Sequence, residues 1–553
     1  MSQESKLTDM DKLEQSDVSI APRGWTRLQK VVSAVALVLS ATLAMSAWAL
    51  STAVGGAPDD DYHLSSIWCT SFSGPDCEID PAGQGVMIPP PLLVSSYCLY
   101  HNSQQSAGCQ PFLDGTDPRE DFAFGHNNPS RGLYPNGFYM VGNLFKSDNI
   151  ETTVVSFRLF NIAVFLALLG SLWLLLPSRL RVTLAWTWPI ALIPLGMFLI
   201  PSTNPSSWAI MAVGIGWLSL LGYLESSGWR SVGLGAVYVA ALILSVSSRV
   251  DSILFLGVAS VLALWQAPLT PRQLLKKTWV AVFPLAFVVA RLITTPGNLE
   301  RVIGGVNTNG VTNSTLPWTQ SADALLPGEF DWALLWNNIW SVPGLWTGVF
   351  GGRPLGSLGW LDTALPQIVG VGVGIVVLGL IFESLRSPGK KKAWALAAVF
   401  GALWVIPVYL LQISGALAGV EFQPRYLVPF MVVVVGTIVL THDGVPLIRD
   451  RFRLSAITVA LVVANAVALH TNIRRYTTGT LVQGFNLNSP REWWWGFLPE
   501  AISPNVVWIV GSLAFALPVW FAFIVLTQKI NTAKKLVEDD HPATATQEPT
   551  LSK

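Results

Sequence analysis

Long apolar runs recur along this chain and are separated by shorter polar connections. A membrane-spanning α-helix needs about 20 consecutive apolar residues, and about twelve stretches approach that length. They are residues 31–50, 159–176, 184–200, 208–224, 232–246, 253–265, 279–294, 368–382, 394–413, 427–440, 454–469 and 506–526. The pattern predicts an all-α integral membrane protein with about twelve transmembrane helices.

The composition supports the same class. Hydrophobic residues make up 51% of the 553 residues and charged residues only 12%, which is unlike a soluble globular protein. The formal net charge is zero, whereas a nucleic-acid partner requires a basic surface that neutralises phosphates. We therefore expect a lipid bilayer, and no nucleic acid, as a partner of the chain.

Positive charge is sorted to one side of the predicted spans. Cytoplasmic connections of membrane proteins collect Lys and Arg, and here such residues precede the first run and recur in alternate connections. They are Arg23, Arg27, Lys30, Arg179, Arg181, Arg230, Arg272, Lys276, Lys277, Arg386, Lys390, Lys391, Lys392, Arg449, Arg451, Arg453, Lys529, Lys534 and Lys535. Both termini are therefore predicted to be cytoplasmic.

The chain divides into a transmembrane domain, residues 30–527, and two polar arms, residues 1–29 and 528–553. The arms have mixed charge and no apolar periodicity, which predicts disorder. Two long connections, residues 53–156 and 296–366, fall on the non-cytoplasmic side. They are rich in Trp, Tyr, Asn, Gly and Pro, so we expect folded structures that cover the non-cytoplasmic face of the membrane.

The first apolar run ends in Ser46-Ala47-Trp48-Ala49, which resembles a signal-peptide cleavage site. Its apolar stretch is longer than that of a secretory signal, and the arm before it is long. We interpret this run as an uncleaved anchor, while cleavage would remove one helix.

All four cysteines, Cys69, Cys77, Cys98 and Cys109, lie in the connection 53–156. A non-cytoplasmic position favours disulfides, and four cysteines allow three pairings. The pairing of sequence neighbours, Cys69 with Cys77 and Cys98 with Cys109, is preferred. Zinc ligation is the alternative, but the spacing lacks a Cys-x-x-Cys pair.

Three adjacent carboxylates and a histidine follow the first apolar run. They are Asp59, Asp60, Asp61 and His63, directly after Pro58. An acid at a membrane boundary can serve as a base, a metal ligand or a proton relay, and is a functional candidate. Ordinary loops also use Asp and Pro, so a solvated turn that ends the helix is the alternative.

Two arginines stand at predicted non-cytoplasmic helix ends, against the charge rule. Arg249 and Asp251 share a short turn, and Arg425 precedes Tyr426 at the start of the run 427–440. An arginine there can bind a phosphate through its planar fork. The alternatives are a local ion pair between Arg249 and Asp251, and snorkelling of Arg425 to the interface.

Other polar residues of the first long connection give no compact metal-ligand spacing. His101 and His126 lie there with several acids, and surface positions are the simpler interpretation. The sequence requires no cofactor, and a divalent ion such as Mg²⁺ or Mn²⁺ is the candidate that carboxylates would hold.

Tryptophans gather in the outer connections. They are Trp332, Trp336, Trp340, Trp346, Trp493, Trp494 and Trp495. Such residues are typical of the aromatic belt at a membrane interface, and stacking on sugars is the alternative.

An ordered set of motifs resembles the bacterial membrane family known as domain of unknown function 2142. The segment 58–63 resembles its Pro-Asp-Glu-x-x-His element. The later motifs are Tyr134-Pro135 with Phe138-Tyr139, Asn204-Pro205, Leu358-Gly359-Trp360-Leu361-Asp362-Thr363 with Leu365-Pro366, and Arg425-Tyr426-Leu427-Val428-Pro429. The resemblance extends from Val31 to about Leu440. Asp60 replaces the usual Glu, and Pro424 stands where Gly is usual before Arg425.

That family is in turn similar to the GT-C superfamily of integral-membrane glycosyltransferases, which take a sugar from a polyprenyl-phosphate carrier. The resemblance implies a GT-C-like fold in a bacterial plasma membrane, with the active face outside the cytoplasm. It makes Asp59 the expected general base and Asp60 the second candidate, with His63 orienting a carboxylate or the phosphate. The expected substrate-binding residues are Asp61, Tyr134, Arg249, Asp251, Trp360, Asp362, Arg425 and Tyr426.

The acceptor implied by this resemblance is a glycan or lipid of the cell envelope. Two other function classes use the same residues differently. A transporter or flippase of a polyprenyl-linked glycan would use the charges as a pathway, and would place charges at mid-helix. A non-enzymatic envelope assembly protein would use the outer connections as docking surfaces.

Overall fold

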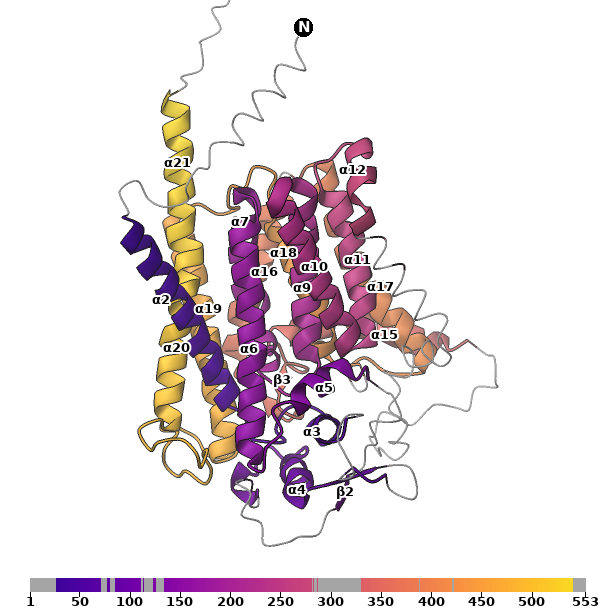
Figure 1. The fold of residues 1–553 in the computed structure, drawn as a ribbon, viewed down its shortest axis with the longest axis vertical. Helices are drawn as coiled ribbons and strands as arrows, with labels where there is room; N and C mark the ends of the chain where they lie inside the picture. Colours follow the sequence, from indigo (N-terminus) through magenta and orange to yellow (C-terminus); the bar gives the residue numbers. More distant parts are fainter. Residues whose placement is uncertain are drawn as a thin grey trace, which may run out of the picture.

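The computed structural model describes residues 26–70, 77–79, 85–110, 113, 123–125, 134–280, 282, 286, 330–386, 388–419 and 422–540. Within these ranges the protein is mostly helical, and a helical bundle carries a smaller region at one end (Figure 1). Residues 1–25 and 541–553, which form the larger part of the first predicted disordered arm and half of the second, lie outside the described residues, as does His126.

The bundle consists of α2 (Arg27–Leu50), α6 (Ile150–Leu175), α7 (Ser178–Ala191), α8 (Leu195–Leu199), α9 (Ser206–Glu225), α10 (Gly228–Ser248), α11 (Val250–Gln266), α12 (Pro271–Lys277), α16 (Gln367–Leu385), α17 (Lys390–Ser414), α18 (Val428–Val439), α19 (Arg451–Thr477), α20 (Pro504–Trp520), η4 (Phe521–Val525) and α21 (Leu526–Asp540). The other elements are α3 (Asp60–Trp68), β1 (Val86–Ile88), α4 (Pro90–Leu99), η1 (Ala107–Cys109), β2 (Ala123–Gly125), α5 (Gly137–Asn143), α15 (Trp332–Val349), β3 (Ser357–Leu358), β4 (Thr363–Ala364) and η3 (Pro424–Tyr426).

Among the described residues, 8 helices are long and apolar enough to cross a membrane: α2, α6, α9, α10, α16, α17, α19 and the continuous helix Pro504–Ala533. The apolar α11 and α18 are shorter, with 17 and 12 residues. The predicted span 184–200 is divided between α7 and α8, because Pro194 has no N–H to continue a helix. Most of the span 279–294 lies outside the described residues. The number of twelve spans is therefore not confirmed.

Helix α9 lies at the centre of the packing. Its apolar window is 100% buried, and it contacts α7, α10, α11 and α18. A helix that is hydrophobic on all sides is expected to be buried in this way. Glycines allow the close approach: a Cβ on Gly214 would lie 2.6 Å from Val432, and one on Gly216 would lie 2.5 Å from Leu256.

The described ends of the chain lie on one side of the bundle. Helix α2 begins and α21 ends at the end opposite α3 and α4 (Figure 1). Helix α21 continues to Asp540, beyond the predicted domain boundary at residue 527. The polar residues after 527 therefore extend a membrane helix for several turns before the described chain ends.

The connection 53–156 folds against the opposite end of the bundle. Helices α3, α4 and α5 lie there, and β1 pairs antiparallel with β2, with Met87 opposite Phe124. The preferred cysteine pairing is present: Cys69 bonds Cys77, and Cys98 bonds Cys109. A second hydrophobic cluster, separate from that of the bundle, fills this region.

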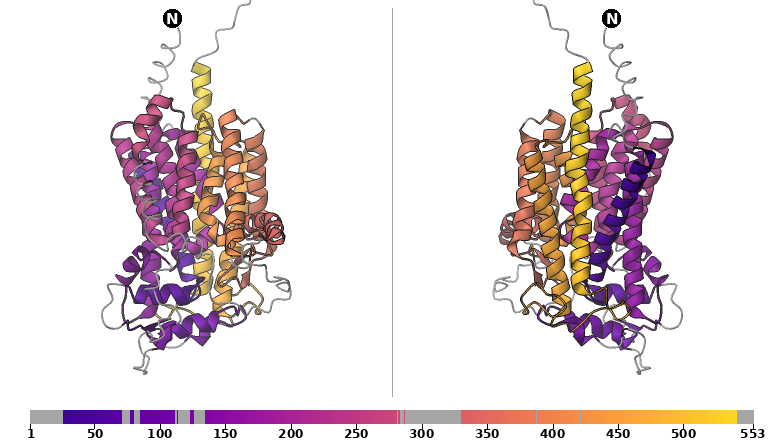
Figure 2. Two further views of the ribbon diagram at one scale, coloured as in Figure 1. Left: turned by 90° about the vertical axis from the view of Figure 1, so that its right-hand side faces the viewer. Right: turned by 90° about the vertical axis from the view of Figure 1, so that its left-hand side faces the viewer.

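The connection 296–366 also contains regular structure. Helix α15 runs across the bundle, and Figure 2 shows it nearly end-on while the spanning helices run vertically. Trp332, Trp336 and Trp340 are all more than 60% exposed, on one face at helical spacing. The hairpin β3–β4 follows, with Leu358 opposite Thr363.

Arg158 of α6 fixes the position at which α2 ends. Its side chain is 0% exposed, and it donates hydrogen bonds to the carbonyl oxygens of Ala49, Thr52 and Ala53. The last four carbonyl groups of a helix have no partner within it. The C-terminal end of a helix also carries partial negative charge, which favours a cation. Arg158 therefore satisfies the end of α2 in a buried environment.

Arg158→Met is expected to lower the free energy of unfolding by about 3–5 kcal/mol, because it leaves buried carbonyl groups and Asp60 without their cation. Thermal unfolding of the detergent-solubilised protein measures the effect. Arg386→Met is the matched control, since the Arg386 side chain is 77% exposed and its contact with Glu383 is 3.6 Å. Equal melting temperatures for the two variants would contradict this role of Arg158.

Candidate functional site

The segment between α2 and α3 is held by side chains from three distant parts of the chain. The Tyr476 hydroxyl donates to the carbonyl oxygen of Gly56 at 2.7 Å, and the Trp360 indole N–H donates to that of Gly55 at 2.9 Å. The Asn204 amide donates to the carbonyl oxygen of Pro58 at 2.8 Å. These contacts fix the backbone that leads into the three aspartates.

Glycine is required where this segment packs most closely. Gly55 has φ +73°, and a Cβ there would lie 2.7 Å from the backbone nitrogen of Ser96. A Cβ on Gly56 would lie 2.6 Å from the ring of Tyr476. The Gly-Gly pair therefore lets the acid-bearing segment lie directly against α4 and α19.

Asp59 is the residue immediately before α3 and has a left-handed backbone, with φ 58° and ψ 25°. This conformation is uncommon for a residue with a side chain, and such strain concentrates at functional sites. The Asp59 side chain is 38% exposed and forms an ion pair with Arg425 at 2.8 Å. Asp59 thus presents a partly accessible carboxylate beside a buried cation.

Asp60 occupies the opposite environment, with 0% of its surface exposed. Its carboxylate accepts hydrogen bonds from the Thr203 hydroxyl at 2.6 Å and the Ala57 N–H at 3.0 Å. Burial raises the pKa of Asp60 to about 7, against the opposing effect of Arg158. Asp60 therefore ties α3 to the turn before α9.

Two arginines meet at one tyrosine ring beside Asp59. The guanidinium carbons of Arg249 and Arg425 lie 4.5 and 5.0 Å from the centre of the Tyr426 ring. The ring face attracts cations, and the effect is stronger where water is excluded. The two positive groups therefore share one anchor although they come from different parts of the chain.

Arg249 also forms the local ion pair that the sequence left as an alternative. Its Nε and Nη2 atoms bond the Asp251 carboxylate at 2.9 and 2.7 Å, and Nη1 donates to the Ser206 hydroxyl at 3.1 Å. The local pair and the position beside Tyr426 occur together. Arg249, Asp251, Arg425 and Tyr426 therefore form one cluster with Asp59.

His63 lies buried among tyrosines. Its Nδ1 is 2.9 Å from the Tyr139 hydroxyl, and its ring centre is 5.3 Å from that of Tyr134. Burial lowers the pKa of His63 to about 3, helped by Arg425 and Arg249 and opposed by Asp59. His63 is thus hydrogen-bonded to the phenol of Tyr139. The sequence had suggested that it orients a carboxylate or a phosphate.

The remaining predicted residues divide between two places. Tyr134 joins the Asp59 cluster, 5.4 Å from the ring of Tyr62, and burial raises its pKa. Asp362 instead forms an ion pair with Arg475 at 2.9 Å, and Trp360 lies close by in the β3–β4 hairpin. Through its bond to Gly55, Trp360 connects this second group to the acid-bearing segment.

Comparison with known proteins identifies a family that matches the sequence. The family described as predicted membrane protein (DUF2142) matches residues 43–434, which is more than half of the chain. The chain belongs to this family. No match was found among curated proteins or among solved structures. The family description gives no activity, so the function of this DUF2142 protein has to be argued from its own residues.

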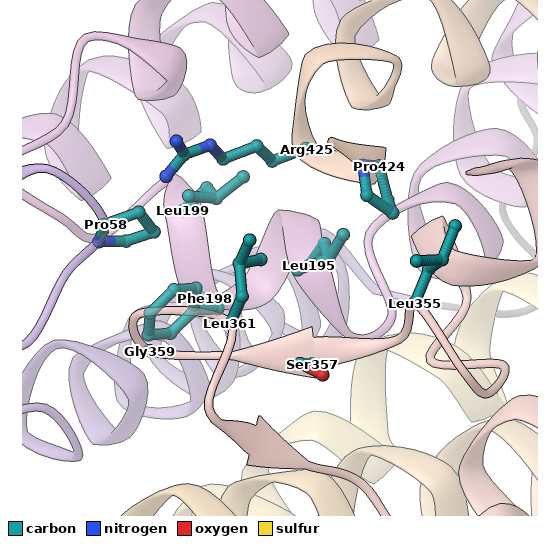
Figure 3. Close-up of a pocket in the computed structure, with 10 residues that line it drawn as sticks. All are labelled: Pro58, Leu195, Phe198, Leu199, Leu355, Ser357, Gly359, Leu361, Pro424 and Arg425. Carbon is teal, nitrogen blue, oxygen red and sulfur yellow. The ribbon is translucent and has the colours of Figure 1, made fainter. Parts of the chain in front are cut away.

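A small pocket of this DUF2142 protein opens beside the Asp59 cluster (Figure 3). Its walls are mainly apolar and come from the segments around α8, β3 and η3. Arg425 lies along its edge, and the buried Nε of Arg425 has no hydrogen-bond partner. The lining residues are Pro58, Leu195, Phe198, Leu199, Leu355, Ser357, Gly359, Leu361, Pro424 and Arg425.

The described residues do not bring together three or more His, Cys, Asp or Glu side chains that could hold a metal ion. The carboxylates of the site instead have other partners. Asp59 pairs with Arg425, Asp251 with Arg249, and Asp60 accepts from Thr203. A site for Mg²⁺ or Mn²⁺ is therefore not apparent in the part of the chain that the structure describes.

Several important residues were missed by the sequence interpretation. Arg158 and Arg475 are fully buried cations that fix the segments around the site, and Tyr476 holds Gly56. A signal was present for Arg158, since it directly precedes the predicted run 159–176, and an ionisable residue in a membrane helix is a functional candidate by default. Trp493 and Trp495 were assigned to the membrane belt but are buried in the second hydrophobic cluster, 8% and 2% exposed.

The acid stability of this DUF2142 protein is expected to depend on His63. Because its pKa falls from 6.5 to about 3, the unfolded chain binds more protons in that interval. The contribution of neutral His63 to the stability of the folded state is fully present above about pH 6.5 and is lost as the pH falls toward 3. Between about pH 7 and 5, the melting temperature should therefore fall more for wild type than for His63→Gln.

Melting temperatures in detergent at several pH values test this expectation. The raised pKa of Asp60 contributes the opposite pH dependence, but Asp60 is present in both proteins and cancels in the comparison. His442→Gln is the control, because His442 is exposed. Parallel profiles for wild type and His63→Gln would contradict the proposed burial of a neutral imidazole.

Proposed function

We propose that this protein is a membrane glycosyltransferase that moves a sugar from a polyprenyl-phosphate donor to a glycan or lipid acceptor of the bacterial cell envelope. The observation that carries the proposal is the Asp59 carboxylate, which is partly exposed, lies immediately before α3 and is 2.8 Å from buried Arg425. The resemblance to GT-C enzymes supports the same assignment. A lipid-linked donor brings its sugar phosphate to the depth at which this carboxylate lies.

In the proposed reaction Asp59 is the general base. It accepts the proton of an acceptor hydroxyl as that oxygen bonds the anomeric carbon of the sugar. The bond between the anomeric carbon and the phosphate oxygen breaks, and the polyprenyl phosphate leaves with the electron pair. The reaction therefore needs a base on one side of the sugar and positive charge on the other.

Arg425 and Arg249 supply that positive charge. Both lie at the Tyr426 ring beside Asp59, and preorganised cations stabilise charge that develops on a leaving phosphate. The planar guanidinium suits the phosphate oxygens. Arg425 already contacts Asp59, so a bound phosphate would compete for this cation and release the carboxylate for the acceptor.

Asp60, His63 and Asp61 have supporting roles in this proposal. Asp60 is buried with its carboxylate hydrogen-bonded, so it positions Asp59 rather than taking a proton from the acceptor. His63 is buried and bonded to Tyr139, which fixes the face of α3 beside the arginines. Asp61 is partly exposed and lies within the same helix, where it contributes to substrate binding.

The active face is proposed to lie outside the cytoplasm. The positive charge of the connections supports a cytoplasmic location for both termini. The described chain ends lie at the bundle end opposite α3 (Figure 1). The Asp59 cluster then faces the compartment in which disulfides form, and the two cystines of the outer region agree with that location.

Asp59→Asn is expected to reduce sugar transfer by about 10²–10⁴-fold, the range of a lost general base. The assay uses reconstituted protein, synthetic polyprenyl-phosphate sugars and envelope-glycan acceptors. Asp148→Asn is the matched control, because Asp148 is an exposed acid in the connection between α5 and α6. Activities are compared only between proteins that have the same melting temperature as wild type.

The outcomes of this assay separate the function classes. Transfer that is undiminished in Asp59→Asn removes Asp59 from the mechanism. Absence of transfer with every donor, together with movement of the lipid-linked sugar across vesicles, would favour a flippase instead. Absence of both activities would favour an assembly protein.

A further inference from the structure

An aromatic platform lies beside the acid-bearing segment, on its outer side. It consists of Tyr100, His101 and Trp360, whose ring centres are 4.2 Å apart between Tyr100 and His101 and 4.9 Å apart between Tyr100 and Trp360. Tyr100 is 46% exposed, and His101 is also exposed. Tyr100 directly follows α4, which lies beyond α3 as seen from the bundle (Figure 1). The platform therefore presents the exposed rings of Tyr100 and His101, with Trp360, which is 5% exposed, packed against them.

A fully buried cation, Arg475, connects the segment that carries Tyr100 and His101 with the segment that carries Trp360. Arg475 donates to the Asp362 carboxylate at 2.9 Å, two residues after Trp360. The same guanidinium nitrogen donates to the carbonyl oxygen of Leu99 at 3.1 Å, one residue before Tyr100. The Arg475 side chain is 0% exposed, and breaking a buried ion pair is strongly destabilising. The exposed rings thus stand on a rigid support.

The platform is also tied to the catalytic segment of the proposed mechanism. The Trp360 N–H donates to the carbonyl oxygen of Gly55, four residues before Asp59. The pKa of Tyr100 is raised by partial burial and then by the charges of Asp61 and Asp59. The hydrogen bond between Trp360 and Gly55 is the contact that joins the platform to this segment.

The backbone of His101 is strained at the exposed edge. Its φ is +48°, in the left-handed region that residues with side chains seldom adopt. The turn is closed by the hydrogen bond from the Asn102 N–H to the carbonyl oxygen of Leu99 at 3.3 Å. Strain of this kind persists where the surroundings enforce it, and it clusters at ligand sites.

We propose that this platform is the acceptor subsite and that it binds a sugar ring. The apolar C–H face of a pyranose or furanose ring packs on an exposed aromatic ring, as apolar surfaces do. Its hydroxyls donate to carboxylates, here Asp61 and Asp59. Ring surface beside carboxylates is thus suited to a carbohydrate, whereas a lipid chain would find charges at this site.

This inference rests on the proposed function and makes it more specific. Of the two acceptor classes, it selects a glycan over a lipid. The acceptor would approach from the aqueous side over Tyr100, with the hydroxyl that loses its proton directed at Asp59. The donor phosphate would remain on the other side of Asp59, at Arg425 and Arg249.

Direct binding tests the subsite without requiring turnover. The probes are methyl glycosides of common hexoses and pentoses and their soluble disaccharides. Saturation-transfer NMR detects them on the full-length protein in a detergent that has no sugar headgroup. We expect at least one probe to bind wild type, and Tyr100→Ala to weaken its binding about tenfold.

Two further variants separate stacking from other causes. Tyr100→Phe keeps the ring face and should bind within about twofold of wild type. Phe485→Ala is the matched control, because Phe485 is an 82% exposed aromatic residue in a different outer loop. Its binding should equal that of wild type. Melting temperatures of all variants exclude a general loss of folding.

The results distinguish failure of the subsite from failure of the proposed function. If sugars bind and depend on Tyr100 while no donor supports transfer, the subsite stands and the glycosyltransferase proposal falls. If transfer occurs but the acceptor KM is the same in Tyr100→Ala, the subsite is wrong and the proposed function stands. If no probe binds wild type and a lipid acceptor supports transfer, the glycan acceptor is wrong.

Discussion

The fold depends on satisfying the carbonyl groups that α2 exposes where it ends inside packed protein. Arg158 donates hydrogen bonds to the carbonyl oxygens of Ala49, Thr52 and Ala53. The Trp495 indole bonds the carbonyl oxygen of Leu50 at 2.8 Å. Unsatisfied backbone groups cost free energy where water is absent. Arg158 of α6 and Trp495 therefore both pack at the C-terminal end of α2. The position of the next residues, including all three aspartates, follows from that arrangement.

This constraint explains how neighbouring acids acquire different environments. Asp60 points into the protein toward Thr203 and the charge of Arg158. One residue earlier, the left-handed backbone of Asp59 turns its side chain toward Arg425 and partial exposure. Two carboxylates with different surroundings can hold different roles, one positional and one chemical. The strained φ of Asp59 is therefore the local feature that separates them.

The sequence predicted the features that are encoded locally. Apolar runs located the described spanning helices, because burial in a bilayer depends on length and hydropathy. The two disulfides were also anticipated. Helix α15 was missed, since its Asn337, Asn338 and Pro343 interrupt the apolar pattern. The site contacts were beyond local reasoning: Asp59 and Arg425 are 366 residues apart, and Asp362 and Arg475 are 113 apart.

The distribution of polar groups also bears on how the site relates to the membrane. Arg249, Arg425 and Arg475 meet groups at the α3 end of the bundle. Within the bundle, Asn161 accepts from the Trp208 indole, and Asn465 accepts from the Trp48 indole. These amides are thus engaged in packing, and α9 is buried along its whole apolar window. A transport pathway needs groups that water or substrate can reach through the bundle, whereas chemistry at one face needs a closed bundle beneath it. Around α9 the described packing is closed.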